Sequence, residues 1–160
     1  MHVERREVSA ADVARRAVAP LATAMDLRDV NLVLQLDEAA TFQGDAPWTA
    51  EAVENIAKNC MEHTPPGGTV TVAVREDALA TTIAVSDTGP GIAPEDLPHI
   101  FERFYRGGAV EEANVAQPAG FGIGLSLAQA LVSAQGGTLR ASNNPAGGAR
   151  FEIAFPKLVV

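Results

Sequence analysis

Asn55 and Asn59 are the first residues whose type and spacing suggest chemistry. They lie four positions apart within residues 48–63, a stretch without glycine or proline, so a helix would place one side chain above the other. Asparagine is a poor helix former because its amide competes with the backbone for hydrogen bonds. Its amide oxygen is also a hard ligand of the kind that Mg²⁺ accepts. The pair indicates either a magnesium site or a solvated helix face opposite the apolar stripe.

A second candidate is the segment D-T-G-P-G-I at Asp87–Ile92, which follows an apolar run typical of a strand. A carboxylate at a strand end can accept a hydrogen bond from an exocyclic amine. Gly89 and Gly91 would let the backbone approach a flat ligand closely. Taken alone, the segment also fits an ordinary turn.

A third candidate, G-F-G-I-G-L at Gly120–Leu125, opens a predicted helix. The start of a helix presents free backbone N–H groups and the positive end of the helix dipole, which together suit a phosphate. Residues 115–119 do not form the strand of a dinucleotide-binding unit, and no Gly-Lys-Ser/Thr sequence of a phosphate-binding loop occurs. Both common nucleotide-binding folds are therefore disfavoured.

A fourth candidate is F-E-R-F-Y-R at Phe101–Arg106, within a connection rich in glycine, proline and acidic residues. Connections of this length inside a small domain are usually functional lids. In a lid, the aromatic rings would dock and an arginine would meet phosphate oxygens. The alternative is a small satellite core with surface arginines.

The elements that must position these segments follow from local periodicity. Ser9, with Asp12 three residues later, predicts a helix start as the first element of the chain. The other expected elements are strands at 31–36 and 41–43, a helix at 48–63, a hairpin of 69–75 with 81–85, one or two helical turns within 94–104, a helix at 123–133, and strands at 138–142 and 149–155. They predict an α/β fold: a two-layer sandwich in which about three helices cover one face of a mixed sheet.

Composition excludes several classes of protein. The 160 residues suit one domain, and twelve Lys+Arg against twenty Asp+Glu give a net charge of −8, which would repel a nucleic-acid backbone. Cys60 has no partner for a disulfide, and the three histidines lack metal-ligand spacing. No apolar run approaches the roughly 18 residues of a membrane span. We expect a cytoplasmic domain without direct membrane contact.

In this order and spacing, the four segments resemble the N box (N-I-A-K-N-C-M-E-H-T), first glycine box, F box and second glycine box of bacterial sensor histidine kinases. The resemblance covers residues 9–156. It implies the Bergerat ATP-binding fold, which is shared with DNA gyrase, a heat-shock chaperone and a mismatch-repair protein. It also implies a single domain over 1–160 with a core at 9–156 and an ATP lid at 88–119.

The resemblance assigns a role to each motif. Asn59 would hold Mg²⁺ with Asn55 beside it, and Asp87 would bind the adenine amino group. Arg103 or Arg106 would meet the γ-phosphate or the partner helix, while Phe101 and Phe104 would anchor the lid. The residues implied at ATP are Asn55, Asn59, Glu62, His63, Asp87, Gly89, Gly91, Ile92, Phe104, Gly120, Phe121, Gly122, Ile123, Gly124 and Leu125.

The chain also departs from the common family pattern at four positions. Glu62 stands where many members carry lysine, His63 where they often carry tyrosine, Cys60 where alanine is common, and Phe121 where threonine or serine is frequent.

The implied activity is transfer of the γ-phosphoryl group of ATP to a histidine on a separate dimerisation domain, for relay to a response regulator. None of the three histidines has the sequence context of such an acceptor. We therefore expect the dimerisation helices, and a membrane-spanning sensor, to precede Met1 in a homodimeric parent. In ATPase relatives a glutamate takes the position of Asn55, so we expect very slow hydrolysis of ATP.

Two other functions remain open. A stand-alone anti-sigma-factor serine kinase has similar length and fold, but it carries glutamate in the place of Asn55 and lacks an F box. A nucleotide-binding regulatory domain without transfer activity is the other alternative, and the departures at Glu62 and Phe121 are consistent with it.

Overall fold

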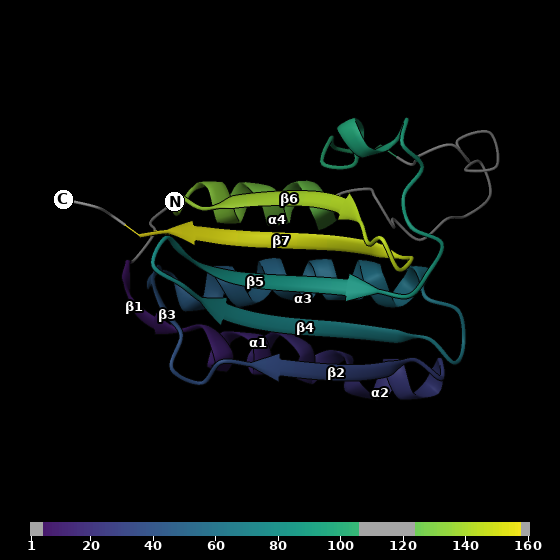
Figure 1. Cartoon of the computed structure of the whole chain (residues 1–160), viewed down its shortest axis with the longest axis horizontal. Helices are drawn as coiled ribbons and strands as arrows, with labels where there is room; N and C mark the ends of the chain where they lie inside the picture. Colours follow the sequence, from purple (N-terminus) through teal and green to yellow (C-terminus); the bar gives the residue numbers. More distant parts are fainter. Residues whose placement is uncertain (1–4, 106–123, 158–160) are drawn as a thin grey trace.

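The computed structural model describes residues 5–105 and 124–157. Five strands form one mixed sheet in the order β2-β4-β5-β7-β6 (Figure 1). Their bounds are β2 Asn31–Leu36, β4 Thr69–Glu76, β5 Ala80–Asp87, β6 Thr138–Asn143 and β7 Ala149–Pro156. Strand β2 pairs with β4 in parallel, whereas every other neighbouring pair is antiparallel.

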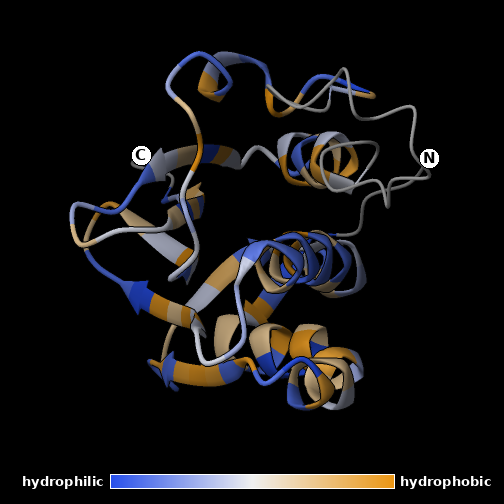
Figure 2. Ribbon diagram, turned by 90° about the vertical axis from the view of Figure 1, so that its right-hand side faces the viewer, coloured by the Kyte–Doolittle hydropathy of each residue, from blue (hydrophilic) through white to orange (hydrophobic). Residues whose placement is uncertain are grey.

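The helices cover one face of this sheet, as Figure 2 shows in side view. They are α1 Ala10–Val18, α2 Ala22–Leu27, α3 Ala46–His63 and α4 Gly124–Ser133, with 3₁₀ turns at Ala19–Leu21 and Leu97–His99. The predicted two-layer α/β sandwich with a mixed sheet is confirmed. None of the helices in the described ranges is long and apolar enough to cross a membrane.

Period-two alternation explains why the sheet buries one face. In β4, Val70, Val72 and Val74 are almost fully buried beneath the helices, and β7 contributes Phe151 and Ile153 to the same core. Helices pack against only one face of such a sheet, because the residues that point to the other face are mostly small or polar. The hairpin predicted between β4 and β5 is confirmed, with Val70 opposite Asp87.

The start of the chain differs from the prediction. The first element is strand β1, Arg6–Ser9, rather than a helix, and it pairs antiparallel with β3, Thr41–Gly44. The four residues R-E-V-S show no apolar alternation. Their strand can therefore be recognised only from its pairing with β3. Ser9 does cap α1 by accepting a hydrogen bond from the Asp12 amide at 3.2 Å.

The first helical stretch is also interrupted. Pro20 lies in the 3₁₀ turn that separates α1 from α2. Proline has no amide hydrogen and its ring clashes with the preceding turn, so one regular helix cannot run through this position. The helix predicted to start at Ser9 is therefore followed by a second, separate helix.

Helix α3 is the main support of the candidate site. Asp45 caps its start by accepting a hydrogen bond from the Trp48 amide at 3.0 Å, and Pro47 occupies the first turn, where its missing N–H costs nothing. The helix ends at His63, and Thr64, the residue before Pro65, adopts extended backbone. The predicted helix at 48–63 is confirmed and begins two residues earlier.

Candidate functional site

Asp87 ends β5 and is only 4% exposed. Its Oδ1 accepts hydrogen bonds from the amides of Gly89 at 2.9 Å and Ala149 at 3.0 Å. Two backbone donors on one carboxylate oxygen fix the orientation of the group. Asp87 is therefore a buried acceptor held at the end of a central strand.

Gly89 and Gly91 are required by close contacts in the loop after Asp87. A Cβ on Gly89 would lie 2.4 Å from the backbone oxygen of His63, so the loop packs directly on the end of α3. Gly91 has φ of +81°, a left-handed conformation in which side chains are strained. The two glycines thus allow close packing within the protein, and their approach to a flat ligand stays a prediction.

Cys60 joins α3 to Asp87. Its side chain is fully buried. Burial raises the pKa of the Cys60 thiol well above its usual range, and the negative charge and hydrogen bonding of Asp87 raise it further. The thiol is therefore a neutral group packed beside the carboxylate.

The two asparagines of α3 lie at different depths. Asn59 is 5% exposed, whereas Asn55 is half-buried, so Asn59 does not lie on a solvated face. The backbone oxygen of Asn59 lies 2.8 Å from Nδ1 of His63, whose side chain is exposed, and Glu62 is half-buried. Through Cys60 beside Asp87 and the His63 oxygen against Gly89, the last turn of α3 lies alongside the loop that follows β5.

Helix α4 begins next to Asn55 of α3. A Cβ on Gly124 would lie 3.9 Å from Cβ and Oδ1 of Asn55, which places the start of α4 beside the N box. Leu125 is fully buried in the core, so a ligand could meet it only through its backbone. The predicted site residues Arg106, Gly120, Phe121, Gly122 and Ile123 lie outside the described residues.

The described F-box residues differ in how they pack. Phe101, which follows the fully buried Ile100, is partly buried and packs edge-on against Phe151 with 6.4 Å between ring centroids. Phe104 is instead 61% exposed with φ of +66°, and the Arg103 guanidinium lies 5.0 Å from its ring centroid. Phe101 thus packs against the core and the Phe104 ring is mostly exposed, while their role as lid anchors stays a prediction.

Tyr105 is held by a carboxylate of the same segment. Its hydroxyl donates a hydrogen bond to Asp96 Oδ1 at 2.5 Å. This hydrogen bond, followed by burial, raises the pKa of Tyr105 to about 12.

The β6–β7 turn contributes contacts that sequence reasoning missed. Asn143 Oδ1 accepts a hydrogen bond from the Ile92 amide at 2.7 Å, and Asn143 Nδ2 donates to the Ile92 oxygen at 2.8 Å. Gly148 has φ of +90°, and a Cβ there would lie 1.9 Å from the Asp87 oxygen. The only sequence signal for this contact is the turn N-N-P-A-G-G, which by itself predicts just a hairpin.

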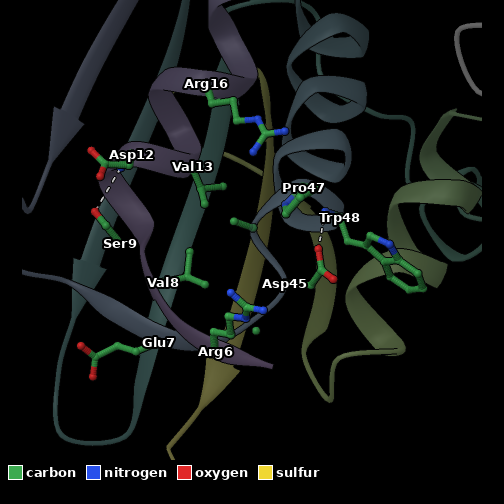
Figure 3. Close-up of a pocket in the computed structure, with 12 residues that line it drawn as sticks. Arg6, Glu7, Val8, Ser9, Asp12, Val13, Arg16, Asp45, Pro47 and Trp48 are labelled. Atoms are coloured by element: carbon green, nitrogen blue, oxygen red, sulfur yellow. Dashed lines mark hydrogen bonds between the residues drawn. The ribbon is translucent and has the colours of Figure 1, made fainter. Parts of the chain in front are cut away.

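A separate pocket of about 660 Å³ lies at the opposite end of α3, between β1, α1 and the start of α3 (Figure 3). Arg6 and Arg16 extend into this region together with acidic and apolar side chains. Ser9 and Asp45 already cap the two helices that begin there. No predicted site residue lies in this pocket, and its mixed charges favour no single ligand.

Solved structures that resemble this chain include catalytic domains of histidine kinases. The mycobacterial sensor histidine kinase MprB superposes with a TM-score of 0.80 at 27% identity, over 95% of this chain and 97% of that one. The catalytic domain of histidine kinase ThkA gives 0.82 at 19% identity, over 96% of each chain, which supports the fold. The described sheet, helices and Asp87 loop thus define a histidine-kinase-like ATP-binding domain.

The chain belongs to the histidine kinase-, DNA gyrase B- and HSP90-like ATPase family, whose pattern matches residues 44–159. Its curated relatives are sensor kinases. It is 29% identical to SenX3 of Mycobacterium tuberculosis over 96% of this chain, and 33% identical to IrlS of Burkholderia pseudomallei over 97%. These matches cover 37% of SenX3 and 32% of IrlS, so the chain spans about a third of the relatives' length.

Proposed function

We propose that this chain binds Mg²⁺-ATP between α3, α4 and the Asp87 loop, and transfers the γ-phosphoryl group to a histidine of its parent protein. The observation that carries the proposal is the buried, backbone-oriented carboxylate of Asp87 at the edge of α3. The family match and the sensor-kinase relatives support it. Histidine kinase ShkA has been solved with the ATP analogue AMPPNP, and ThkA with the response regulator TrrA.

Each described motif has a role in this proposal. Asp87 accepts the hydrogen bond of the adenine amino group, and Gly89 and Gly91 let the base lie against the loop. The amide oxygens of Asn59 and Asn55 supply the hard, neutral donors that Mg²⁺ takes in small numbers alongside water and phosphate oxygens. Gly124 lies beside Asn55, which supports a phosphate position at the start of α4.

The reaction that this arrangement suits is in-line phosphoryl transfer. The bond between the γ-phosphorus and the oxygen leaving with ADP breaks, a phosphorus–nitrogen bond to the imidazole forms, and the imidazole proton passes to solvent. Positioning and charge neutralisation provide most of the catalysis in such reactions. Arg103, which is exposed, and Arg106 are the proposed cationic groups. Bound Mg²⁺ would offset charge on the phosphates.

Slow hydrolysis is part of the same proposal. A water-activating carboxylate would have to replace Asn55, and the neighbouring Glu54 lies roughly 100° further around the helix, since an α-helix has about 3.6 residues per turn. Turnover comparable to that of a dedicated ATPase would contradict the assignment.

The proposed partners are dimerisation helices carrying the acceptor histidine and a response regulator, in a homodimeric parent with this domain in the cytoplasm. The proposed lid at 88–119 includes Ile92 and Ile100, whose side chains are part of the hydrophobic core.

Binding is tested by calorimetric titration with a non-hydrolysable ATP analogue, with and without Mg²⁺. We expect micromolar binding that is lost in Asp87→Asn, which preserves shape but adds a donor where an acceptor is needed. Asp26→Asn is the matched control, because Asp26 is exposed and lies on α2, which is not one of the elements of the proposed site. Absence of binding by the unchanged chain would refute an ATP function.

Transfer is tested by adding a separately produced dimerisation fragment with its acceptor histidine and γ-labelled ATP. We expect label on that fragment and none on the isolated chain. Binding without transfer would select a regulatory nucleotide-binding domain instead, and label on a serine of a partner protein would select the anti-sigma-factor type.

A further inference from the structure

Asn143, the last residue of β6, uses both ends of its side-chain amide on one residue of the Asp87 loop. Oδ1 accepts from the Ile92 amide at 2.7 Å and Nδ2 donates to the Ile92 oxygen at 2.8 Å. The two residues are 51 positions apart in sequence. A pair of hydrogen bonds of opposite direction constrains both the position and the orientation of the peptide groups on either side of Ile92.

The clamp lies at the outer end of the loop formed by residues 87–92. At the inner end, Asp87 Oδ1 accepts from the Ala149 amide at 3.0 Å. A Cβ on Gly91 would lie 2.8 Å from Asn143 Oδ1, so the loop passes directly against the amide. The loop is therefore held at both ends by the strands β6 and β7, on either side of one turn.

We propose that Asn143 is a positioning residue of the adenine pocket. It acts through Ile92, holding Gly89 and Gly91 in the conformation that receives the base. The proposal rests on the proposed function, in which this loop binds adenine. Two glycines give the loop many conformations of similar energy, and a loop that is ordered before binding does not lose that entropy when the ligand arrives.

The choice of asparagine follows from the two backbone groups that it meets. Ile92 presents a donor and an acceptor, and a carboxamide is complementary to both, whereas aspartate lacks the donor and places a second negative charge near Asp87. Alanine removes both bonds. Asn144 is the matched neighbour, because its backbone takes part in the turn and alanine keeps both bonds: its amide donates to the Gly148 oxygen, and its oxygen accepts from the Gly147 amide.

The first test measures the clamp without nucleotide. In the full 160-residue chain, Asn143→Ala should speed hydrogen exchange of the Ile92 amide by about tenfold or more, while amides in the middle of β5 keep their protection. Asn144→Ala should leave the exchange rate of the Ile92 amide unchanged. Unchanged Ile92 exchange in Asn143→Ala would overturn the clamp itself, whatever the chain binds.

The second test measures its consequence for binding. ADP should bind about tenfold more weakly to Asn143→Ala. The variant loses both side-chain hydrogen bonds to Ile92, so the loop must become ordered during binding without them. Asn143→Asp, which keeps the acceptor for the Ile92 amide, should fall between Asn143→Ala and the unchanged chain, and Asn144→Ala should match the unchanged chain. Faster Ile92 exchange with unaltered ADP affinity would overturn the positioning role.

Transfer kinetics separate positioning from general destabilisation. With a supplied histidine fragment, Asn143→Ala should raise KM for ATP about tenfold with kcat unchanged, as expected when ground and transition states lose the same binding. A fall in kcat in proportion to the lost folded fraction, at constant KM, would mean that the residue is only structural. Failure of the unchanged chain to bind ADP would refute the proposed function, and hydrogen exchange would still report on the clamp.

Discussion

At the scale of single residues, the site is a set of polar atoms satisfied by backbone groups from distant strands. Asp87 Oδ1 is bonded to the amides of Gly89 and Ala149, while Cys60 and Asp87 lie side by side in the interior. Each of these contacts orients a group before any ligand binds. Preorganised polar groups of this kind lose less conformational freedom when a complementary ligand binds.

Gly147 and Gly148 form a matched pair for testing this packing. Both have positive φ, but a Cβ on Gly147 would meet nothing within 4 Å, whereas one on Gly148 would lie 1.9 Å from the Asp87 oxygen. Gly147→Ala should lower the free energy of unfolding by about 1 kcal/mol, from backbone strain alone. Gly148→Ala should lower it by more than about 3 kcal/mol, because the Asp87 backbone must move.

Urea unfolding of the two variants measures the difference. Equal losses in the two variants would show that the close approach of Gly148 to Asp87 does not constrain the fold.

Tyr105 is the single tyrosine of the chain, so its titration can be followed by phenolate absorbance. Its pKa is raised from an ordinary value of 10.0 to about 12, mainly by the hydrogen bond to Asp96. Because the folded pKa lies above the unfolded one, this bond contributes stability that is fully present below pH about 10 and is lost as pH rises through about 12.

Asp96→Ala should return the midpoint of the Tyr105 titration toward 10. A midpoint that stays near 12 in this variant would show that Asp96 is not the cause of the shift.

At the scale of elements, α3 and α4 are joined at the end remote from the proposed ATP site by Gln135. This side chain is 2% exposed. Its Oε1 accepts from the Asp45 amide at 2.7 Å and from Thr49 Oγ1 at 3.1 Å, and Nε2 donates to the Leu131 oxygen at 3.0 Å. The bridge fixes how the two helices lie against each other, and so where Asn55 and Gly124 meet.

Gln135→Met keeps the volume of the side chain but removes its polar atoms, which leaves the buried Asp45 amide without this acceptor. The free energy of unfolding should fall by about 2 kcal/mol, as expected for an unsatisfied buried donor. Gln35→Met on exposed β2 is the matched control and should change little. Chemical denaturation measures both, and equal effects would show that the Gln135 bridge contributes nothing specific.

At the scale of the whole molecule, Glu76 of β4 connects the small β1–β3 sheet and Lys157, which follows β7, to the main sheet. Glu76 Oε1 accepts from the Thr41 amide at 3.1 Å, and Oε2 pairs with Lys157 at 2.7 Å. The hydrogen bond from Lys157, followed by that from Thr41, lowers the pKa of Glu76 below its ordinary value of 4.5. Hydrogen bonds from the Leu79 and Ala80 amides likewise lower the pKa of Asp77 below 3.8.

These depressed pKa values fix the direction of the acid response. A carboxylate with a lowered folded pKa contributes stability that is present above its unfolded pKa and is lost as pH falls through the folded value. Stability should therefore decline as pH falls below about 4.5, and Glu76→Gln should make the decline shallower. Thermal unfolding measured from pH 7 downward checks this, and an identical slope in the variant would exclude Glu76 as a contributor.

The sequence by itself determined the elements whose signals are local. Helix α3 and the β4–β5 hairpin follow from apolar periodicity and from glycine and proline residues within short windows. The order and spacing of the four boxes then indicate the fold and the family. The family resemblance also placed Asp87 and its glycines, because their pattern lies within six consecutive residues.

Only the tertiary structure decided the contacts between windows. The pairing of β1 with β3, the burial of Asn59 and the clamp of Asn143 on Ile92 each depend on partners far apart in the chain or in other elements. A four-residue strand and a turn asparagine carry no periodic signal of their own. Their conformations are selected by long-range hydrogen bonds and packing, which exist only after the sheet and helices have assembled.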